Sequence, residues 1–281
     1  MTTLDLGPTG AVLSPAEDGF VETAAELEGL GYSTIWLTGG PMSSLSQIAD
    51  VVRATSTARI ATAIIPVDTF TSDDVASLYT ELEGDHPGRF VVGLGGAHGA
   101  DPLVTLNAYL DRLDGVVPQE RRLMAALGPR MFELARERAA GALPVLITPA
   151  YAEQAKATLG AGAVLAVEQL AVVETDPDRA RAIARGPLGF LGQVPAYQAN
   201  FRRMGFSQDD ITPLGNALVD AVVAWGGVDA IATRVGELRT AGADHVAVSI
   251  VSASPAPTRA EWAAVAEALI AARGSTGTSR S

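Results

Sequence analysis

Residues 59–96 read RIATAIIPVDTFTSDDVASLYTELEGDHPGRFVVGLGG, and this stretch decides the fold class. It begins with the run Arg59–Ile65, whose successive apolar positions are typical of a strand buried on both faces. Ser72-Asp73-Asp74 then supplies the acidic start of a helix. Apolar residues recur on this helix at helical spacing, at Val75, Leu78, Tyr79 and Leu82. A second apolar run follows at Phe90–Leu94, so the stretch predicts a βαβ unit with parallel strands.

The same alternation of apolar runs and helical patterns fills the rest of the chain. The predicted strands are Gly10–Leu13, Thr34–Leu37, Arg59–Ile65, Phe90–Leu94, Arg122–Ala126, Pro144–Thr148, Val164–Val173 and His245–Val251. The predicted helices open near Ser14-Pro15 and at Ser72, and otherwise cover Ser44–Thr55, Leu103–Leu113, Pro129–Ala139, Ala152–Leu159, Asp176–Phe206, Gly215–Trp225, Val228–Ala241 and Arg259–Ala272. Eight strands, each followed by helix, predict an α/β protein with a (β/α)8 TIM-barrel fold, and 281 residues suit that fold.

No linker or change of composition divides the chain, so we expect one barrel domain over residues 1–273. The Gly/Ser/Thr-rich stretch Gly274–Ser281 is expected to be a flexible tail. The formal net charge of −12 argues against binding to nucleic acid or to an anionic membrane. The chain has no cysteine, which excludes disulfides and thiolate chemistry. We see no signal peptide and no apolar run long enough to span a bilayer, so we expect a cytoplasmic protein.

The functional residues of such a barrel lie in the loops that follow its strands. No pair of histidines has metal-ligand spacing, and no G-x-S-x-G nucleophile motif occurs. Glu168 and Asp176 flank a predicted strand without an obvious partner. This scarcity of acid and base groups at strand ends favours chemistry performed by a bound cofactor.

Two glycine-containing segments each leave two interpretations open. Gly93-Leu94-Gly95-Gly96 resembles the start of a dinucleotide fingerprint but lacks the third glycine, so it marks either ligand contact or a packing turn. Gly128-Pro129-Arg130 stands at a strand-to-helix junction, where free N–H groups and an arginine could bind an anion. The alternative is an ordinary helix start with a solvated arginine. His98 follows the first segment and could act as an acid or base, or be structural.

Taken together, the ordered segments resemble the luciferase-like monooxygenase superfamily, and within it the F420-dependent oxidoreductases of actinobacterial type. The likeness covers nearly the whole chain, and the segments that carry it are Ala25–Tyr32 with Ile35–Leu37, Ala54-Thr55 with Arg59–Ile64, Pro87–Gly95, Ala125–Met131 with Leu134-Ala135, Tyr197–Phe206 and Ala241–Val246.

The resemblance implies a deazaflavin or flavin at the C-terminal mouth of the barrel. Its ring would lie near Ala63, Ile64, Gly93 and Gly95. Members often have a non-prolyl cis peptide or a bulge on the third strand, at the position of Ala63-Ile64. The cofactor phosphate would bind Gly128, Pro129 and Arg130, with Thr148 nearby. His98 would be the catalytic residue, Thr38 and Asp68 would line the substrate pocket, and a homodimer would be expected.

The chain departs from its relatives at three places. Thr38-Gly39-Gly40 stands where many members have an acidic residue and a histidine. Pro66-Val67-Asp68 stands where an Asn and a Trp would be expected. The long insertion before the fifth strand is missing, which implies a shortened insertion region and a more open pocket.

The leading hypothesis is hydride transfer between coenzyme F420 and a small organic substrate. The first alternative is an FMN-dependent monooxygenase of the same fold, and the second is a non-catalytic barrel that binds a flavin or nothing. An aldolase-like barrel is disfavoured because the only lysine, Lys156, lies within a predicted helix rather than at a strand end.

Overall fold

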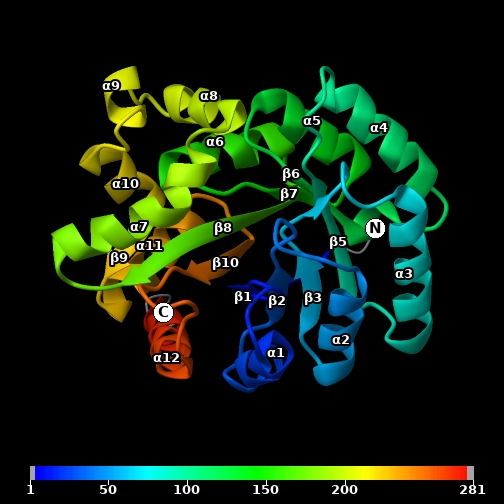
Figure 1. The fold of residues 1–281 in the computed structure, drawn as a ribbon, viewed down its shortest axis with the longest axis horizontal. Coiled ribbons are helices and arrows are strands. Elements are labelled where there is room, and N and C mark those ends of the chain that lie inside the picture. Colours follow the sequence, from blue (N-terminus) through cyan, green and yellow to red (C-terminus); the bar gives the residue numbers. More distant parts are fainter. Residues whose placement is uncertain (1–3, 277–281) are drawn as a thin grey trace.

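The structure is a computed structural model and describes residues 4–276. Parallel strands form a barrel, and helices surround it (Figure 1). The eight barrel strands, in neighbour order, are β1 (Thr9–Leu13), β2 (Thr34–Leu37), β3 (Arg59–Thr62), β5 (Phe90–Gly95), β6 (Arg122–Ala125), β7 (Gly141–Leu143), β8 (Val164–Val173) and β10 (His245–Ile250). The barrel closes because β10 pairs with both β8 and β1. This confirms the predicted (β/α)8 architecture.

The helices that cover the barrel begin with the capping chemistry that their sequences carry. The Thr71 side chain accepts a hydrogen bond from the Asp74 N–H, and Thr148 caps its own helix through the Tyr151 N–H. The covering helices are α1 (Phe20–Gly29), α2 (Ser46–Ala54), α3 (Ser72–Asp85), α4 (Pro102–Leu113), α5 (Pro129–Arg138), α6 (Pro149–Leu159), α11 (Val228–Thr240) and α12 (Arg259–Thr276), with a short 3-10 turn at Gln119–Arg121. The last helix includes the first residues of the predicted tail, and residues 277–281 lie outside the described residues.

A long excursion separates β8 from β10 and gathers beside the far end of β8 (Figure 1). Its elements are α7 (Pro177–Leu191), α8 (Pro195–Arg203), α9 (Gln208–Ile211), α10 (Asn216–Val222) and β9 (Val223–Gly226). Within the described residues, strand β9 pairs with the second half of β8 alone, from Leu170 to Val173. Residues of these elements form a separate apolar cluster that includes Phe201 and Leu218. We call residues 174–227 the α7–β9 excursion.

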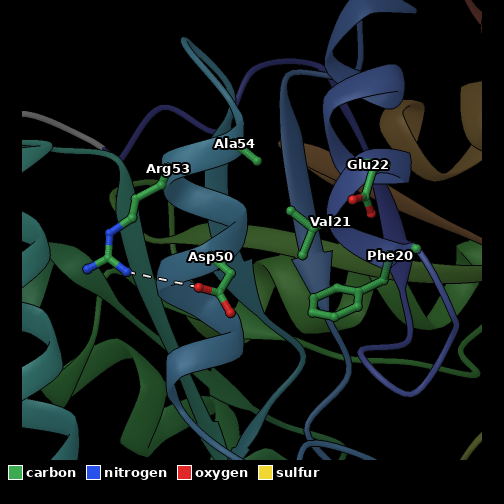
Figure 2. A pocket seen from close by; sticks show the side chains of 7 residues that line it. Phe20, Val21, Glu22, Asp50, Arg53 and Ala54 are labelled. Atoms are coloured by element: carbon green, nitrogen blue, oxygen red, sulfur yellow. Dashed lines mark ion pairs between the residues drawn. The ribbon is translucent and has the colours of Figure 1, made fainter.

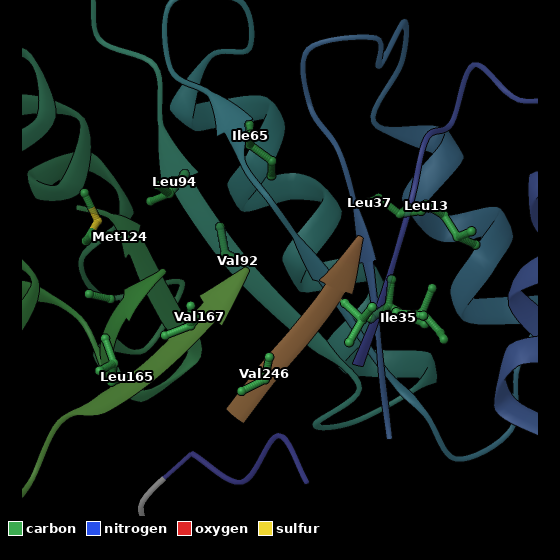
Figure 3. Close-up of a cluster of buried hydrophobic side chains, with 14 of the residues drawn as sticks. Leu13, Ile35, Leu37, Ile65, Val92, Leu94, Met124, Leu165, Val167 and Val246 are labelled. Carbon is green, nitrogen blue, oxygen red and sulfur yellow. The ribbon is translucent and has the colours of Figure 1, made fainter. Parts of the chain in front are cut away.

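Side chains alternate between the two faces of each barrel strand, so the barrel has an inner and an outer apolar layer. The outer layer lies between strands and helices, and Ile35, Val92 and Val246 belong to it (Figure 3). The inner layer fills the barrel, and its members include Trp36, Ala61, Val91, Leu123, Ala166 and Ala247. Position along a strand therefore decides whether a side chain reaches the interior.

The sixth strand lies earlier in the chain than predicted. The prediction of Pro144–Thr148 is wrong, and the strand is β7, Gly141–Leu143. Residues 144–148 instead form an irregular connection whose one bridge joins Val145 to Glu168. Pro144 lacks an N–H for a sheet ladder, and Leu146 has a φ of 55°, which a strand does not accommodate. Helix α6 then begins at Pro149 rather than at Ala152.

Three predicted helices also differ from the structure. Helix α1 begins at Phe20 rather than near Ser14, because a turn ending at Gly19, with a φ of 72°, comes first. The predicted helix Asp176–Phe206 is broken into α7 and α8, and Pro195 restarts it. The predicted helix Gly215–Trp225 ends at Val222, because the following residues pair with β8.

Candidate functional site at the barrel mouth

Inward-facing positions at the C-terminal ends of the strands form a ring around the barrel mouth. Each of these positions lies two residues along its strand from a residue of the inner layer, and on β5 it lies four residues beyond Val91. Because side chains alternate along a strand, each position therefore faces the barrel interior. We define the mouth ring as Thr38, Ala63, Gly95, Ala125, Glu168 and Ser249. All except the buried Gly95 are partly exposed, whereas the inner layer beneath them is buried. The mouth ring is therefore more exposed to solvent than the inner layer on which it rests.

The mouth ring is made of small residues with one exception. Thr38, Ala63 and Gly95 come from neighbouring strands, and Ala125 continues the series. A side chain at Gly95 would lie 2.8 Å from the Ala125 Cβ and 3.2 Å from the Ile64 side chain. This side of the mouth is thus made of small residues that pack closely against one another and against Ile64. Glu168 and Ser249 supply the polar side opposite.

Glu168 is the ionisable member of the ring. Its backbone N–H donates to the Pro144 carbonyl at 2.9 Å, and its carboxyl group is hydrogen-bonded to Ser249 on the adjacent strand. Burial of the carboxyl group raises its pKa from 4.5 to about 7, and the Ser249 hydrogen bond offsets part of this rise. Tyr197 on α8 lies near it, and the pKa of Tyr197 is raised chiefly by burial and also by the Glu168 carboxylate. Glu168 can therefore exchange a proton near neutral pH.

The third strand is interrupted where the resemblance implies a ring-binding segment. The Ala63–Ile64 peptide bond is cis, as expected, and it separates β3 from the short strand β4 (Ile65–Pro66). The buried Thr62 hydroxyl bonds both the N–H and the carbonyl of Gly93, each at 3.0 Å. A Cβ on Gly93 would lie 1.8 Å from the Thr62 carbonyl oxygen. Gly93 therefore allows β3 and β5 to pack closely. Of the two interpretations of the segment Gly93–Gly96, this contact fits packing rather than ligand contact at Gly93.

The predicted catalytic residue and one predicted pocket residue contact each other. The Asp68 carboxylate accepts a hydrogen bond from the His98 N–H at 2.9 Å and lies 3.1 Å from His98 Nδ1. The His98 side chain is 71% exposed and that of Asp68 is 41% exposed. The pair thus joins two loops at the rim rather than projecting into the barrel. Thr38, the other pocket residue, faces the interior, and its hydroxyl is 3.4 Å from the Leu13 carbonyl.

The predicted phosphate residues lie at two adjacent helix starts. Gly128 and Pro129 open α5, Thr148 opens α6, and the Tyr151 hydroxyl donates to the Leu127 carbonyl at 2.6 Å between them. The Thr148 hydroxyl accepts the Tyr151 N–H at 3.2 Å, so it is occupied as a cap. Arg130 is exposed.

Helix α8 brings a second arginine to this place, one that the sequence did not single out for a site. The Arg203 guanidinium packs against Gly128, so that a Cβ there would lie 3.1 Å from Nη2. Arg203 also hydrogen-bonds the Tyr151 hydroxyl, and its Nη1 is 3.5 Å from Asn200 Oδ1. Asn200 is fully buried, and its Nδ2 has no partner among the described residues. We call Gly128, Asn200 and Arg203 the anion cradle.

Two other features of the fold lie outside this site. At the opposite end of the barrel, Trp36 Nε1 donates to His245 Nε2 at 3.0 Å, and burial lowers the pKa of His245 to about 4, in keeping with a structural histidine. A shallow hollow of about 500 Å³ lies between α1 and α2 (Figure 2). It is lined by residues such as Phe20 and Asp50 and contains none of the predicted site residues.

Among residues 4–276, no group of acidic or histidine side chains could hold a metal ion. Over the same residues, no helix has the length and apolarity needed to cross a membrane. Asp176, which the sequence left without a partner, caps α7 by accepting hydrogen bonds from the Asp178 and Arg179 N–H groups.

Comparison with solved structures places the fold. An F420-dependent secondary alcohol dehydrogenase in complex with an F420-acetone adduct aligns with a TM-score of 0.72 at 15% identity, covering 94% of this chain and 98% of that one. A coenzyme F420 dependent tetrahydromethanopterin reductase from Methanopyrus kandleri gives 0.72 at 17% identity, with the same coverage. The FMN-bound oxygenating constituent of 3,6-diketocamphane monooxygenase from Pseudomonas putida gives 0.66 at 12% identity, covering 94% and 98%.

No protein-family profile and no curated protein sequence matches the chain. The chain therefore has the barrel fold shared by F420-dependent oxidoreductases and luciferase-like monooxygenases, as its sequence resemblance implies.

Proposed function

We propose that the protein is an oxidoreductase that moves a hydride between coenzyme F420 and a small organic substrate at the barrel mouth. The observation that carries the proposal is that the small residues of the mouth ring lie at the strand ends, while the anion cradle lies at the start of α5 and on α8, beside the same end of the barrel. A flat ring with a phosphate-bearing tail needs both features. Two of the similar structures are described as F420-dependent, which supports this choice of cofactor.

The residues present fit such a cofactor. Ala63, Gly95 and Ala125 have no side chain beyond Cβ, so a tricyclic ring could lie against them. In the anion cradle, the unpartnered Asn200 Nδ2 and the Arg203 guanidinium are donors suited to a phosphate oxygen. The N–H groups at the start of α5 would add further donors.

A bound deazaflavin would supply hydride transfer, and the chain would supply binding and orientation. Arg203 and Asn200 would hold the phosphate, and Ala63 and Ile64 would support one ring face. Excluding water from the ring face favours transfer to substrate over side reactions. The α7–β9 excursion is suited to this role because its helix α8 carries Tyr197 to Glu168 and Arg203 to Gly128.

The alternative function is an FMN-dependent monooxygenase, since a similar structure binds FMN and the same mouth would take a flavin ring. Binding distinguishes the two, because FMN and F420 can be offered separately to the same protein. A barrel that binds neither cofactor would support the non-catalytic interpretation.

Substitution of the cradle arginine tests the proposal. We expect Arg203→Ala to weaken F420 binding, followed by fluorescence quenching, by roughly 10- to 100-fold, because a hydrogen bond to a charged group contributes about 1.5–3 kcal/mol. Arg202→Ala is the matched control, since Arg202 lies on the same helix turn, is exposed and bonds only Gln208 among the described residues. It should change the affinity by less than about twofold. Equal affinities for the two variants would reject the cradle as the phosphate site.

A further inference from the structure

One position of the mouth ring departs from its small, neutral character. Five of the six positions are Thr, Ala, Gly, Ala and Ser, which have no charge at any working pH. Glu168 is the sixth, and it points into the barrel two residues beyond the buried Ala166. A carboxyl group therefore lies on the inward face of β8, at the same end of the barrel as the small residues of the ring.

The barrel does not need this carboxyl group for its stability. Among the described residues Glu168 takes part in no ion pair, and its side-chain partner is the neutral hydroxyl of Ser249. Enclosing a carboxyl group without a cation is unfavourable, and an apolar residue of similar size would fill the position at lower cost. A residue retained at such a position is a candidate for function.

The groups that surround Glu168 favour proton exchange. Ser249 on β10 bonds the carboxyl group, Tyr197 on α8 is the titratable neighbour, and the Pro144 carbonyl before α6 accepts the backbone N–H. None of these carries a positive charge. The neutral acid is therefore the favoured form up to near neutral pH, where a proton donor is most effective.

The rim pair is less well placed for this task. His98 is 71% exposed, and its ring is engaged with Asp68 on the outer loops. A proton delivered to a substrate inside the mouth needs a donor within hydrogen-bond reach of that space. Glu168 meets this requirement, and His98 is better suited to holding the two loops together.

We propose that Glu168 is the proton-exchanging residue of this site and that the substrate is an uncharged carbonyl compound or the corresponding alcohol. The inference rests on the proposed hydride transfer. When a hydride reaches the carbonyl carbon from a reduced deazaflavin, the C=O π electrons form an O–H bond with the Glu168 proton. The products are an alcohol, a Glu168 carboxylate and the oxidised deazaflavin, and solvent returns the proton to Glu168. The reverse sequence oxidises the alcohol.

The neutrality of the ring supports the substrate class. No mouth-ring residue is cationic, so a substrate carboxylate or phosphate would find no counter-charge there and would be repelled by ionised Glu168. An uncharged ketone or aldehyde would meet a neutral acid and the Ser249 hydroxyl. Ser249 would act as a positioning residue for the carboxyl group.

The test uses Glu168→Gln, with Glu153→Gln as control because Glu153 is exposed on α6. The first measurement is an infrared titration of the protein without cofactor. We expect a protonated-carboxyl C=O band that titrates near pH 7, is lost in Glu168→Gln and is unchanged in Glu153→Gln. The second is F420 binding, which Glu168→Gln should preserve within about threefold, since it alters no cradle residue.

The third measurement is the oxidation of reduced F420 by acetone and cyclohexanone across a pH series. Glu168→Gln should lower kcat roughly 100-fold or more and remove the pH limb near neutrality. Wild-type protein that fails to bind F420 would overturn the proposed function itself. Tight F420 binding with unchanged kcat in Glu168→Gln, or with no such infrared band, would overturn only the role of Glu168. Tight binding without reduction of either ketone would overturn the substrate class.

Discussion

Gly39→Ala is the substitution for which the geometry predicts the sharpest response. Gly39 follows β2, and a Cβ there would lie 1.6 Å from the Ile64 carbonyl oxygen and 2.8 Å from both the Ile64 carbonyl carbon and Pro66 Cδ. Non-bonded carbon and oxygen atoms need more than about 3 Å, so the β2 loop and the third strand would have to separate. Neither obstacle is a flexible side chain that could rotate away.

The expected cost follows from overpacking in a close-packed region. Forcing an extra methyl into such a site costs about 1–3 kcal/mol, and the backbone obstacles put this case at about 3 kcal/mol. The smaller entropy of the unfolded alanine variant offsets roughly 0.4–1 kcal/mol of this. Gly40→Ala is the matched control, because nothing lies within 4 Å of its Cβ position. It should be neutral or slightly stabilising.

Urea unfolding followed by circular dichroism measures the difference between the two variants. We expect the free energy of unfolding to fall by about 2–3 kcal/mol for Gly39→Ala and to change by less than about 0.5 kcal/mol for Gly40→Ala. Because Ile64 lines the proposed ring site, Gly39→Ala should also weaken F420 binding. A Gly39→Ala variant as stable as Gly40→Ala would refute the close packing of the β2 loop against Ile64.

Three further substitutions test the same account. The pKa of Glu168 is raised from 4.5 to about 7 in the folded state, so between these pH values the folded protein keeps a proton that the unfolded chain loses. The free energy of unfolding of the wild type, measured relative to Glu168→Gln, should therefore fall by about 3 kcal/mol as the pH rises from 4.5 to 7. A difference between the two proteins that does not change with pH would contradict this. Thr62→Val should cost about 2 kcal/mol in urea unfolding, because it leaves the buried Gly93 N–H unpaired, whereas Thr62→Ser should restore most of that stability. His98→Ala should change the free energy of unfolding by less than about 0.5 kcal/mol, because its contact with Asp68 joins the two rim loops through exposed, solvated groups. A loss above about 1 kcal/mol would contradict a weak loop contact of this kind.

The architecture could be predicted from the sequence because its pattern is local. The structure confirms the predicted bounds of strands such as Thr34–Leu37 and Val164–Val173, because each run is mostly apolar and lies between turn and cap residues. The predicted position of the sixth strand is wrong because residues 144–148 have the apolar composition of a strand, whereas the observed strand Gly141–Leu143 is too short to show a pattern. Composition alone does not reveal a positive φ at Leu146.

The site could be predicted only in part. The contact between His98 and Asp68 and the adjacency of Gly128 and Thr148 follow from the loops that succeed barrel strands. The sequence shows Glu168 only as an acidic residue without an obvious partner, although its place as the fifth residue of the predicted strand Val164–Val173 is a usable signal. Counting in twos from Ala166 directs Glu168 inward, but only the structure shows that Ala166 faces the barrel interior.

Arg203 and Tyr197 could not have been assigned to the mouth from sequence. Both lie on α8, whose position depends on the apolar cluster of the α7–β9 excursion, around Phe201 and Leu218. That packing joins segments distant in the chain, and a single sequence does not specify it. Through α8, the excursion brings Tyr197 near Glu168 and Arg203 beside Gly128.

Titration of the wild-type protein with F420 and, separately, with FMN tests the central claim most directly. The account predicts saturable binding of F420 at one site per chain, with a clearly weaker response to FMN. Tight binding of FMN without binding of F420 would contradict the choice of cofactor in favour of the flavin alternative. The absence of binding by either would contradict the claim that the small-residue face and the anion cradle form a cofactor site.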